Sequence, residues 1–275
     1  MYSLVQSARI KGNSGAPIPN PSKALAKMEV DFRRGDFSLV CAGPGTGKSI
    51  WAMNLALASE KGIPVMYWSA DSNATTQLSR ATSILTGHHV RDVKKALLED
   101  RFQEYEKSLA DKWWIRLNYE AMPSQKDMEE DLEIYYEVFG CHPHLAVVDN
   151  ITNVDTGGAV NAESFTFGLE GMCEYLNDMA RATEAHVQAL HHVTGEWSDG
   201  LKPIPQSGIK GKIGRVPSLA LTIHKEPDEQ GMNRILNFSP VKNREGFADP
   251  SGNTFVSMEL DSNTLRLKDV ETPTF

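Results

Sequence analysis

One short stretch near the N-terminus decides the fold: Ala42-Gly43-Pro44-Gly45-Thr46-Gly47-Lys48-Ser49. The apolar run before it, Phe37 to Ala42, is typical of a short buried strand. The segment after it, Ile50 to Lys61, is rich in Ala, Leu and Met and carries a helix-stop signal at Gly62. A glycine-rich turn between a strand and a helix lets successive backbone N–H groups converge on an anion at the helix N-terminus. The stretch therefore predicts a phosphate-binding loop.

The end of this loop has the chemistry of a nucleoside triphosphate site. Lys48 supplies a positive charge for the β- and γ-phosphates, and the hydroxyl of Ser49 can bind Mg²⁺. The pattern Gly-x-x-x-x-Gly-Lys-[Ser/Thr] has glycine where this chain has Ala42, so the literal pattern is missed by one residue. Because strand, loop and helix follow in the expected order, we expect residues 42–49 to bind ATP with Mg²⁺.

Asp149 is the expected second half of this site. Leu145 to Val148 is an apolar run that ends on this carboxylate, as buried parallel strands of ATPases do. In phosphate-loop ATPases such an Asp holds the magnesium ion through its water shell. An Asp after an apolar run is weak evidence alone, but it becomes a strong indication downstream of a phosphate loop. We expect Ser49 and Asp149 to hold Mg²⁺, partly through water.

Length, composition and charge narrow the class of protein. A chain of 275 residues fits one large α/β domain with an N-terminal extension. No apolar run reaches the roughly 18 residues that span a bilayer, and the N-terminus has no secretory signal, so we expect a cytoplasmic protein without a membrane partner. The net charge of −8 confines any nucleic-acid site to a local basic region. Three cysteines match no disulfide or zinc spacing: Cys41, Cys141 and Cys173.

The rest of the chain predicts one domain that follows an arm. Residues 11–23 concentrate Gly, Pro, Asn and Ser, so we assign residues 1–30 to an N-terminal arm or linker and residues 31–275 to the main domain. Strands alternate with helices early and cluster late, which predicts an α/β fold with a mostly parallel twisted sheet, flanking helices and antiparallel strands at the C-terminal end. The further strands are expected at Pro64 to Ser69, Trp113 to Leu117, Val187 to His191, Leu219 to His224, Arg234 to Phe238 and Phe255 to Leu260. The further helices are expected near residues 72–87, 89–110, 124–138 and 163–183.

These features resemble the RecA-like ATPase fold, and specifically the motor domain of DnaB-type replicative ring helicases, over roughly Phe32 to Leu260. An alanine at the start of the phosphate loop, as at Ala42, is common in that family. The family's second strand ends in Ser-Leu-Glu, whose glutamate polarises the attacking water, and this chain has Ser69-Ala70-Asp71 there. The resemblance implies this role for Asp71, whose side chain is one methylene shorter and predicts slow hydrolysis. The alternative is that Asp71 helps to cap the following helix.

Two further elements match the family. It carries a γ-phosphate sensor at the end of the strand Val187 to Leu190, where His191 and His192 stand, and His192 matches better. Neighbours on a strand face opposite ways, so the two histidines are not expected to share a metal. Lys242-Asn243-Arg244 looks like the Lys-x-Arg element, in which Arg244 would reach the nucleotide of the neighbouring subunit. The alternative for this element is a solvated turn between strands.

The resemblance also implies two loops that grip single-stranded DNA. Asn150 to Asn161 contains no Lys or Arg and offers only backbone N–H groups, whereas Gly200 to Arg215 is basic and lacks acidic residues. In an acidic protein this is a local electrostatic footprint, and phosphate contacts predict sequence-tolerant binding that weakens with salt. The alternative is a loop that needs charge only for solubility. The basic residues are Lys202, Lys210, Lys212 and Arg215, and Trp197 could add a stacking surface.

The sequence therefore predicts an ATP-dependent DNA helicase or translocase, active in DNA replication on single-stranded or forked DNA. The resemblance implies a homo-oligomer, a hexameric ring that hydrolyses ATP at its subunit interfaces, with the arm of residues 1–30 latched onto a neighbour. Three alternatives stay open. They are a RecA-type DNA recombinase, an ATP-gated single-strand-binding or annealing protein with weak hydrolysis, and a KaiC-like regulatory ATPase that never touches DNA.

Overall fold

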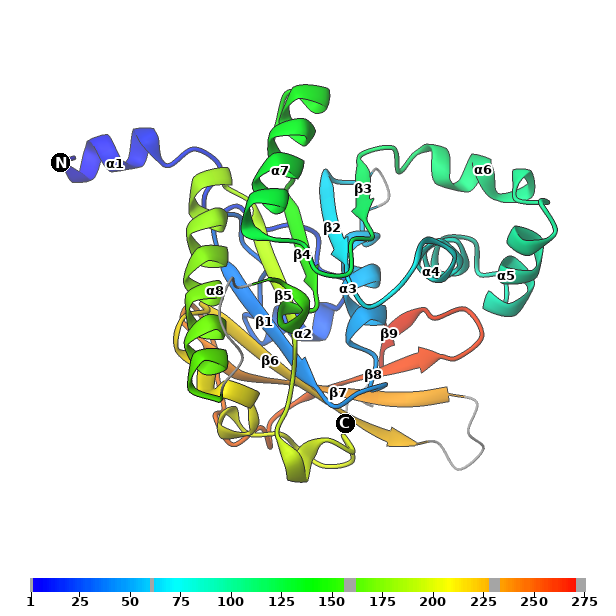
Figure 1. Ribbon diagram of the computed structural model, residues 1–275. Coiled ribbons are helices and arrows are strands. Elements are labelled where there is room, and N and C mark those ends of the chain that lie inside the picture. The colour runs from blue at the N-terminus through cyan, green and yellow to red at the C-terminus, as the bar shows by residue number, and fades with distance from the viewer. Residues whose placement is uncertain (1, 60–61, 156–161, 228–232, 271–275) are drawn as a thin grey trace.

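A single mixed sheet is the frame of the molecule. In the computed structural model, which describes residues 2–59, 62–155, 162–227 and 233–270, this sheet has nine strands in the order β3-β2-β4-β5-β1-β6-β7-β8-β9 (Figure 1). The strands in chain order are β1 (Phe37–Ala42), β2 (Val65–Ser69), β3 (Ile115–Asn118), β4 (Leu145–Asp149), β5 (His186–His192), β6 (Leu219–Pro227), β7 (Asn233–Asn243), β8 (Val256–Asp261) and β9 (Leu267–Asp269).

The first six strands run parallel, and the last three are antiparallel additions. β1 lies at the centre between β5 and β6, and it is parallel to both. β2 pairs with β3 and β4, and β4 pairs with β5, again all in parallel. The pairs of β6 with β7, β7 with β8 and β8 with β9 are antiparallel. The predicted α/β fold, with a mostly parallel sheet and antiparallel strands at the C-terminal end, is confirmed.

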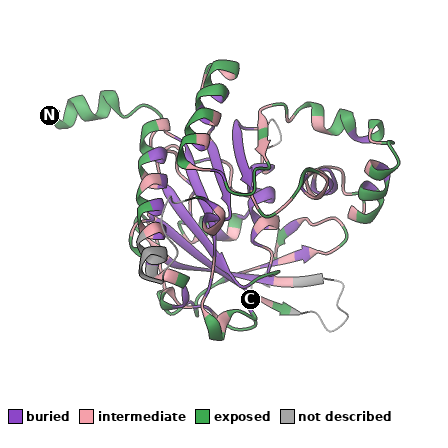
Figure 2. Cartoon of the chain, viewed as in Figure 1, coloured by how far each residue is buried: buried purple, intermediate pink, exposed green. Residues whose placement is uncertain are grey.

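Both faces of the parallel strands are covered, which explains why those strands are apolar throughout. All six residues of β1 are buried: Val40 and Ala42 point into one core cluster and Leu39 and Cys41 into the other. Such continuous burial is usual for parallel strands between helical layers. Figure 2 shows the buried strands enclosed by helices with exposed outer faces.

The helices divide between the two faces. The first core cluster includes apolar side chains of α2 (Lys23–Lys27), α3 (Lys48–Ala56) and α4 (Ala74–Thr86). The second includes those of α7 (Gln125–Phe139) and α8 (Ala162–Thr183). α5 (Val90–Leu98) and α6 (Gln103–Ala110) form a small cluster of their own at the side of the molecule. Short 3-10 helices occupy Ile151–Asn153, Gly195–Trp197, Gln206–Gly208 and Lys210–Arg215.

Several element boundaries differ from those predicted. The predicted helix over residues 89–110 is two helices, because the chain turns at Asp100, which has a positive φ of 53°. α3 ends at Ala56 rather than near Lys61, with Leu57 as its C-cap. β7 does not stop at Phe238 but continues to Asn243, paired with β6 along its length. β9 was not predicted.

The predicted arm has two different parts. α1 (Leu4–Ile10) buries no residue and points away from the body of the molecule (Figure 1). Farther along the arm, Ile18 and Leu25 are buried in the first core cluster. The domain boundary at residue 30 stays a prediction, although part of the chain before it packs on the sheet.

The helices of the described residues can be compared with the requirements for a membrane span. None of their helices combines the length and the apolar character required to cross a membrane.

Candidate active site

The phosphate loop joins the centre of the sheet to a helix. β1 ends at Ala42, and α3 begins at Lys48 after a turn that includes Gly45 and Gly47. These two glycines have φ values of 66° and 119°, a left-handed region that strongly favours glycine. The loop therefore presents its backbone N–H groups at the first turn of α3, where the helix dipole favours an anion.

Lys48 is a buried cation that has, among the described residues, no carboxylate as a direct hydrogen-bond partner. Its Nζ donates to the carbonyl oxygens of Ala42 and Gly43, each at 3.0 Å, and the residue is 7% exposed. Burial lowers the pKa of Lys48, while Asp149 and Asp71 act in the opposite direction. A buried ammonium held by neutral carbonyls is short of negative charge, so an anion such as a phosphate group would stabilise it.

Asp149 lies at the end of β4, beside the start of α3. Its Oδ2 accepts a hydrogen bond from Tyr67 Oη at 2.9 Å, and the Ser49 hydroxyl also bonds its side chain. Burial raises the pKa of Asp149, whereas these two hydrogen bonds lower it. A hydroxyl and a buried carboxylate beside a phosphate loop are the oxygen ligands that suit Mg²⁺, which is usually bound through one or two carboxylates together with substrate phosphates. Ser49 and Asp149 therefore fit the predicted ion.

Asp71 follows β2 and lies near Asp149 and the phosphate loop. Its backbone N–H and that of Ala70 both point to the carbonyl of Asp149, which aligns the ends of β2 and β4. Its side chain accepts hydrogen bonds from Nδ2 of Asn150 at Oδ2 and from Nδ2 of Asn153 at Oδ1. The cap of α4 is Asn73, whose side chain accepts from the N–H of Thr76. The N-cap position of α4 is thus occupied by Asn73 and not by Asp71.

The two histidines at the end of β5 point to different partners. His192 Nε2 lies 3.4 Å from Asn150 Nδ2, and burial together with the nearby Lys48 lowers the pKa of His192. His191 Nε2 lies 2.8 Å from the carbonyl oxygen of Lys210, which can only accept, so His191 donates this bond. His192 therefore faces the phosphate loop, while His191 ties β5 to the basic segment.

One cavity of about 380 Å³ collects the predicted groups of this half of the site. Its volume lies within the range of small-molecule sites. Four of the six predicted catalytic residues line it: Lys48, Asp71, Asp149 and His192. Its other lining residues are Pro44, Gly45, Gly47, Ser49, Ile50 and Arg80.

Arg80 is a charged lining residue that the sequence analysis missed. It lowers the pKa of both Asp149 and Tyr67, so its positive charge acts on the site. Helix phase could have identified it, because Arg80 follows the cap Asn73 by seven residues, two turns of α4, and so faces the same side as the start of that helix.

The other two predicted catalytic residues, Lys242 and Arg244, lie at the opposite end of the parallel strands. Lys242 pairs with Ala220 of β6, which pairs with Leu39 near the start of β1. The N–H of Arg244 donates to the carbonyl of Ser218, in the segment that precedes β6. β1 covers about 17 Å at roughly 3.3 Å per residue before it reaches the phosphate loop. The N–H of Ser218 bonds Phe37 at the start of β1, so within one protomer Arg244 is separated from the phosphate cavity by the length of β1.

The surroundings of Lys242 and Arg244 are basic. Lys242 Nζ donates to the carbonyl oxygens of Gly214 and Arg215, and Arg244 Nη2 donates to those of Arg215 and Val216. Burial and the charge of Arg244 lower the pKa of Lys242 to about 8. A second cavity, of about 680 Å³, opens beside Lys242 and Arg215.

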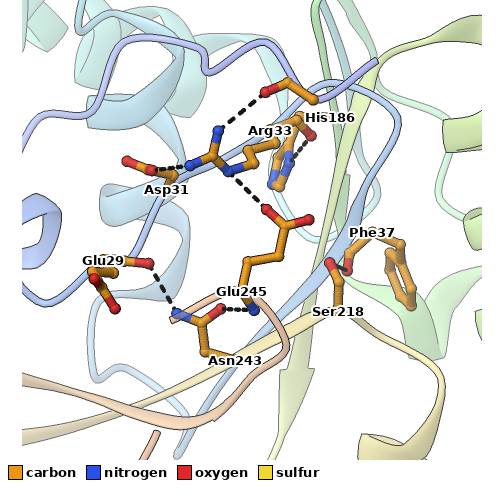
Figure 3. Close-up of polar contacts among 9 residues, drawn as sticks. Glu29, Asp31, Arg33, Phe37, His186, Ser218, Asn243 and Glu245 are labelled. Carbon is orange, nitrogen blue, oxygen red and sulfur yellow. Dashed lines mark hydrogen bonds and ion pairs between the residues drawn. The ribbon is translucent and has the colours of Figure 1, made fainter. Parts of the chain in front are cut away.

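The turn that carries Arg244 is held by the segment before β1. Asn243 Nδ2 donates to the carbonyl of Glu29 at 2.9 Å, and Arg33 Nε pairs with Glu245 at 2.9 Å (Figure 3). At Gly246 a Cβ atom would lie 2.5 Å from the carbonyl oxygen of Glu29, so only glycine allows this approach. The N-terminal segment therefore sets the position of the turn.

The predicted DNA-binding residues are only partly together. Lys202 pairs with Glu196 at 3.7 Å and lies over the ring of Trp197, so both are partly engaged with neighbours. Lys210 and Arg215 bound a 3-10 helix whose Ile213 is buried. The side chain of Lys212 and residues 156–161 of the other predicted loop lie outside the described residues.

The segment that follows His192 packs directly on the phosphate loop. A Cβ atom at Gly43 would lie 2.2 Å from the carbonyl oxygen of Ser198, and one at Gly200 would lie 2.7 Å from Thr46 Oγ1. Residues 198–200 thus contact two positions of the loop. The basic segment begins where this contact ends.

Comparisons with known proteins identify a family and two phage relatives. A family model described as an AAA domain matches residues 10–196. The Gene 65 protein of Mycobacterium phage L5 is 45% identical over 269 residues, covering 98% of this chain and 99% of the relative. The Gene 65 protein of Mycobacterium phage D29 is 46% identical over 233 residues, covering 85% of this chain and 99% of the relative.

Two solved structures share the fold. One is a DnaB-like replicative helicase described with its interactions with primase, with a TM-score of 0.76, 15% identity and coverage of 98% of this chain and 68% of that chain. The other is a solved ATPase domain, with a TM-score of 0.77, 14% identity and coverage of 98% of this chain and 96% of that chain. At these identities the likeness concerns the fold. The predicted similarity to the motor domain of DnaB-type helicases is thereby confirmed.

Proposed function

This chain belongs to the AAA domain family, and from that membership we propose that it is an ATP-dependent DNA helicase or translocase. It acts on single-stranded or forked DNA as an oligomeric ring, most simply a hexamer. ATP is hydrolysed between neighbouring subunits, and residues 31–275 form the motor domain.

The observation that carries the proposal is the separation of the two sets of predicted catalytic residues. Lys48, Asp71, Asp149 and His192 share one cavity. Arg244 lies at the other end of the sheet, beyond the reach of an arginine side chain. A head-to-tail ring brings such opposite faces of two copies together, and a contact of this kind closes into a ring when the rotation between copies allows it.

Each residue of the cavity has a distinct part in hydrolysis. Residues 43–47 bind the phosphates through backbone N–H groups, and Lys48 neutralises the β- and γ-phosphates. Asp71 orients the water that attacks the γ-phosphorus and takes its proton as the bond to the β–γ bridging oxygen breaks. His192 senses the γ-phosphate. Arg244 of the neighbouring copy stabilises the transition state, an effect worth about 10³–10⁵ in rate, or about 4–7 kcal/mol.

Magnesium completes the site. Ser49 and Asp149 would hold Mg²⁺, Asp149 partly through water, and the ion would supply positive charge against the phosphates.

α1 supports assembly into an oligomer. It has a complete capping box and yet buries no side chain, and Leu4 and Val5 are 91% and 64% exposed. A capped helix with uncovered apolar residues is suited to a partner surface. We assign that surface to an adjacent copy, so that the arm acts as a latch.

DNA binding rests on the basic segment that follows β5. Lys202, Lys210, Lys212 and Arg215 contact backbone phosphates, so binding is insensitive to sequence and weakens as salt rises. The contact of residues 198–200 with the phosphate loop provides a route from the nucleotide to this segment.

A second function is favoured by one observation. Asp71 is shorter than glutamate, and both of its carboxylate oxygens are already bonded by asparagine side chains. Slow hydrolysis would suit an ATP-gated single-strand-binding or annealing protein rather than a translocase.

The test measures ATP hydrolysis with and without single-stranded DNA, and unwinding of a forked duplex, for the parent, Asp71→Ala and Arg244→Ala. If the protein is a helicase, DNA should stimulate hydrolysis by the parent, and the parent should unwind the fork. Both variants should lose the stimulated hydrolysis and the unwinding. Binding of single strands without unwinding would favour the annealing protein. Hydrolysis that DNA never changes would favour a regulatory ATPase.

A further inference from the structure

Asn150 lies beside the phosphate cavity and contacts two of the residues that line it, Asp71 and His192. It follows Asp149 directly, is 2% exposed, and has a side chain that contacts Asp71, Thr152 and His192. A buried amide has two donors and one acceptor to satisfy. The contacts of this side chain account for all of them.

The hydrogen-bond network fixes the orientation of this amide. Asn150 Oδ1 accepts from the N–H of Thr152 at 2.9 Å, so the amide nitrogen must face the cavity. There Nδ2 donates one hydrogen to Asp71 Oδ2 and directs the other to His192 Nε2. Nε2 is then the acceptor of the imidazole ring. Asn150 thus joins the carboxylate expected to orient the water to the expected γ-phosphate sensor.

Asn153 contributes a second amide to the same carboxylate. Its Nδ2 donates to Asp71 Oδ1 at 2.8 Å, and its side chain is half-buried. Each carboxylate oxygen therefore holds one amide donor and keeps a further lone pair for water. Two fixed donors prevent the carboxylate from rotating. Its orientation matters because the side chain of Asp71 is one methylene shorter than glutamate and reaches fewer positions for the water molecule.

We propose that Asn150 and Asn153 are positioning residues for Asp71. They hold its carboxylate in the plane from which it orients the attacking water, and Asn150 couples that carboxylate to His192. The inference rests on the proposed ATP hydrolysis. Neither asparagine needs to touch the nucleotide for this role.

The chain contains a matched control. Asn118, at the end of β3, makes the same arrangement: its Oδ1 accepts from the N–H two residues later, and its Nδ2 donates to the carboxylate of Asp131 at 2.7 Å. That pair lies outside the phosphate cavity. Asn118→Ala therefore removes an equivalent amide–carboxylate bond without reaching Asp71.

The experiment compares Asn150→Ala, Asn153→Ala and Asn118→Ala with the parent. Since misplacing a reacting group by about 1 Å can cost about 10²-fold in rate, we expect kcat for ATP to fall about tenfold in each of the first two variants. The affinity for a fluorescent ATP analogue should change by less than about twofold, because neither residue lines the phosphate cavity. Asn118→Ala should keep the parental kcat.

A double-variant cycle separates positioning from general damage. In the Asp71→Ala background, removal of Asn153 should change the residual rate of hydrolysis little, because its partner is already gone. An equal loss with and without Asp71, or a loss of nucleotide affinity, would overturn the inference. If Asn150→Ala unfolds, as thermal melting would show, Asn153→Ala decides alone. A parent that hydrolyses no ATP overturns the proposed function as well, whereas an active parent with a fully active Asn153→Ala variant overturns only the inference.

Discussion

Charged residues with proposed roles in catalysis lie at both ends of the parallel strands, but they are buried at one end and exposed at the other. At the carboxyl end, Lys48 and Asp149 are 7% and 2% exposed and meet in a formed cavity. At the amino end, Arg244 lies on an exposed turn and donates hydrogen bonds to backbone carbonyl oxygens. The groups at the carboxyl end meet within one protomer, whereas the proposed role of Arg244 requires the nucleotide of a neighbouring copy. Within one chain, the phosphate cavity and Arg244 lie at opposite ends of β1, a strand that covers about 17 Å.

The largest expected effect tests whether the amino end acts at all. Arg244→Ala should lower DNA-stimulated ATP hydrolysis by about 10³-fold, because an arginine finger contributes at least this much. Steady-state phosphate release measures it, and gel filtration checks that assembly is unchanged. Arg101→Ala is the control, since Arg101 also contacts neighbours at the surface, between α5 and α6, away from both ends. Full activity of Arg244→Ala would reduce Arg244 to a solvated turn residue.

The next effect tests whether the two ends belong to different copies. Lys48→Ala alone should lose about 10²–10³ in rate because it removes a buried phosphate partner. Mixed one to one with Arg244→Ala, it should restore about a quarter of the parental rate, since one interface in four then joins an intact loop to an intact finger. Two inactive variants that stay inactive when mixed, in oligomers shown to exchange subunits, would contradict the shared site.

A pH series distinguishes the ends by charge. Lys242 has a pKa lowered to about 8, so in the folded protein it loses its proton as pH rises from 7 to 9. In the unfolded chain Lys242 stays protonated up to its ordinary pKa. The free energy of unfolding is therefore lower below about pH 8, where the folded protein must carry this charge, and it rises with pH between the folded and unfolded pKa values. Over the same range the surface around Lys242 loses positive charge. We expect kcat to fall several-fold between pH 7 and 9 in the parent and less in Lys242→Arg, because arginine keeps its charge. Equal pH profiles would exclude a role for the Lys242 charge.

The smallest expected effect concerns the support of the finger turn. Arg33→Ala removes the ion pair with Glu245 that joins the N-terminal segment to this turn (Figure 3). Exposed ion pairs contribute about 0–1 kcal/mol, so thermal stability should barely change. Hydrolysis should fall about two- to threefold if the pair positions Arg244. Arg101→Ala, which also loses surface ion pairs, should leave the rate unchanged.

Much of the fold could be predicted because its signals are local. The phosphate loop, the apolar runs of β1 and β4, and the helix from Ala162 to Thr183 all appear where pattern and spacing indicate. β9 was missed because three residues carry too short a pattern. The split between α5 and α6 was missed because both halves have helical periodicity and only the turn at Asp100 separates them.

The candidate site divides in the same way. Lys48 and Ser49 are recognisable from their neighbours in the chain. Asn150 is not, because an asparagine after a strand is common in any protein, and the helical phase of Arg80 indicates its side of α4 but not the group that it meets. Their importance comes from what lies across the sheet: Arg80 acts on Asp149, and Asn150 meets Asp71 from 79 residues away.

The backbone chemistry of residues 42–49 and the order of strands and helices follow from local sequence, because glycine conformations and apolar periodicity act over a few residues. Which groups share a cavity, and which lie at opposite ends of the sheet, depends on how the strands pair. The parallel pairing of β1 with β5 and β6 sets the first arrangement, and the antiparallel return of β7 sets the second. Strand direction and register arise from long-range contacts, so the distance between Lys48 and Arg244 could be read only from the folded chain.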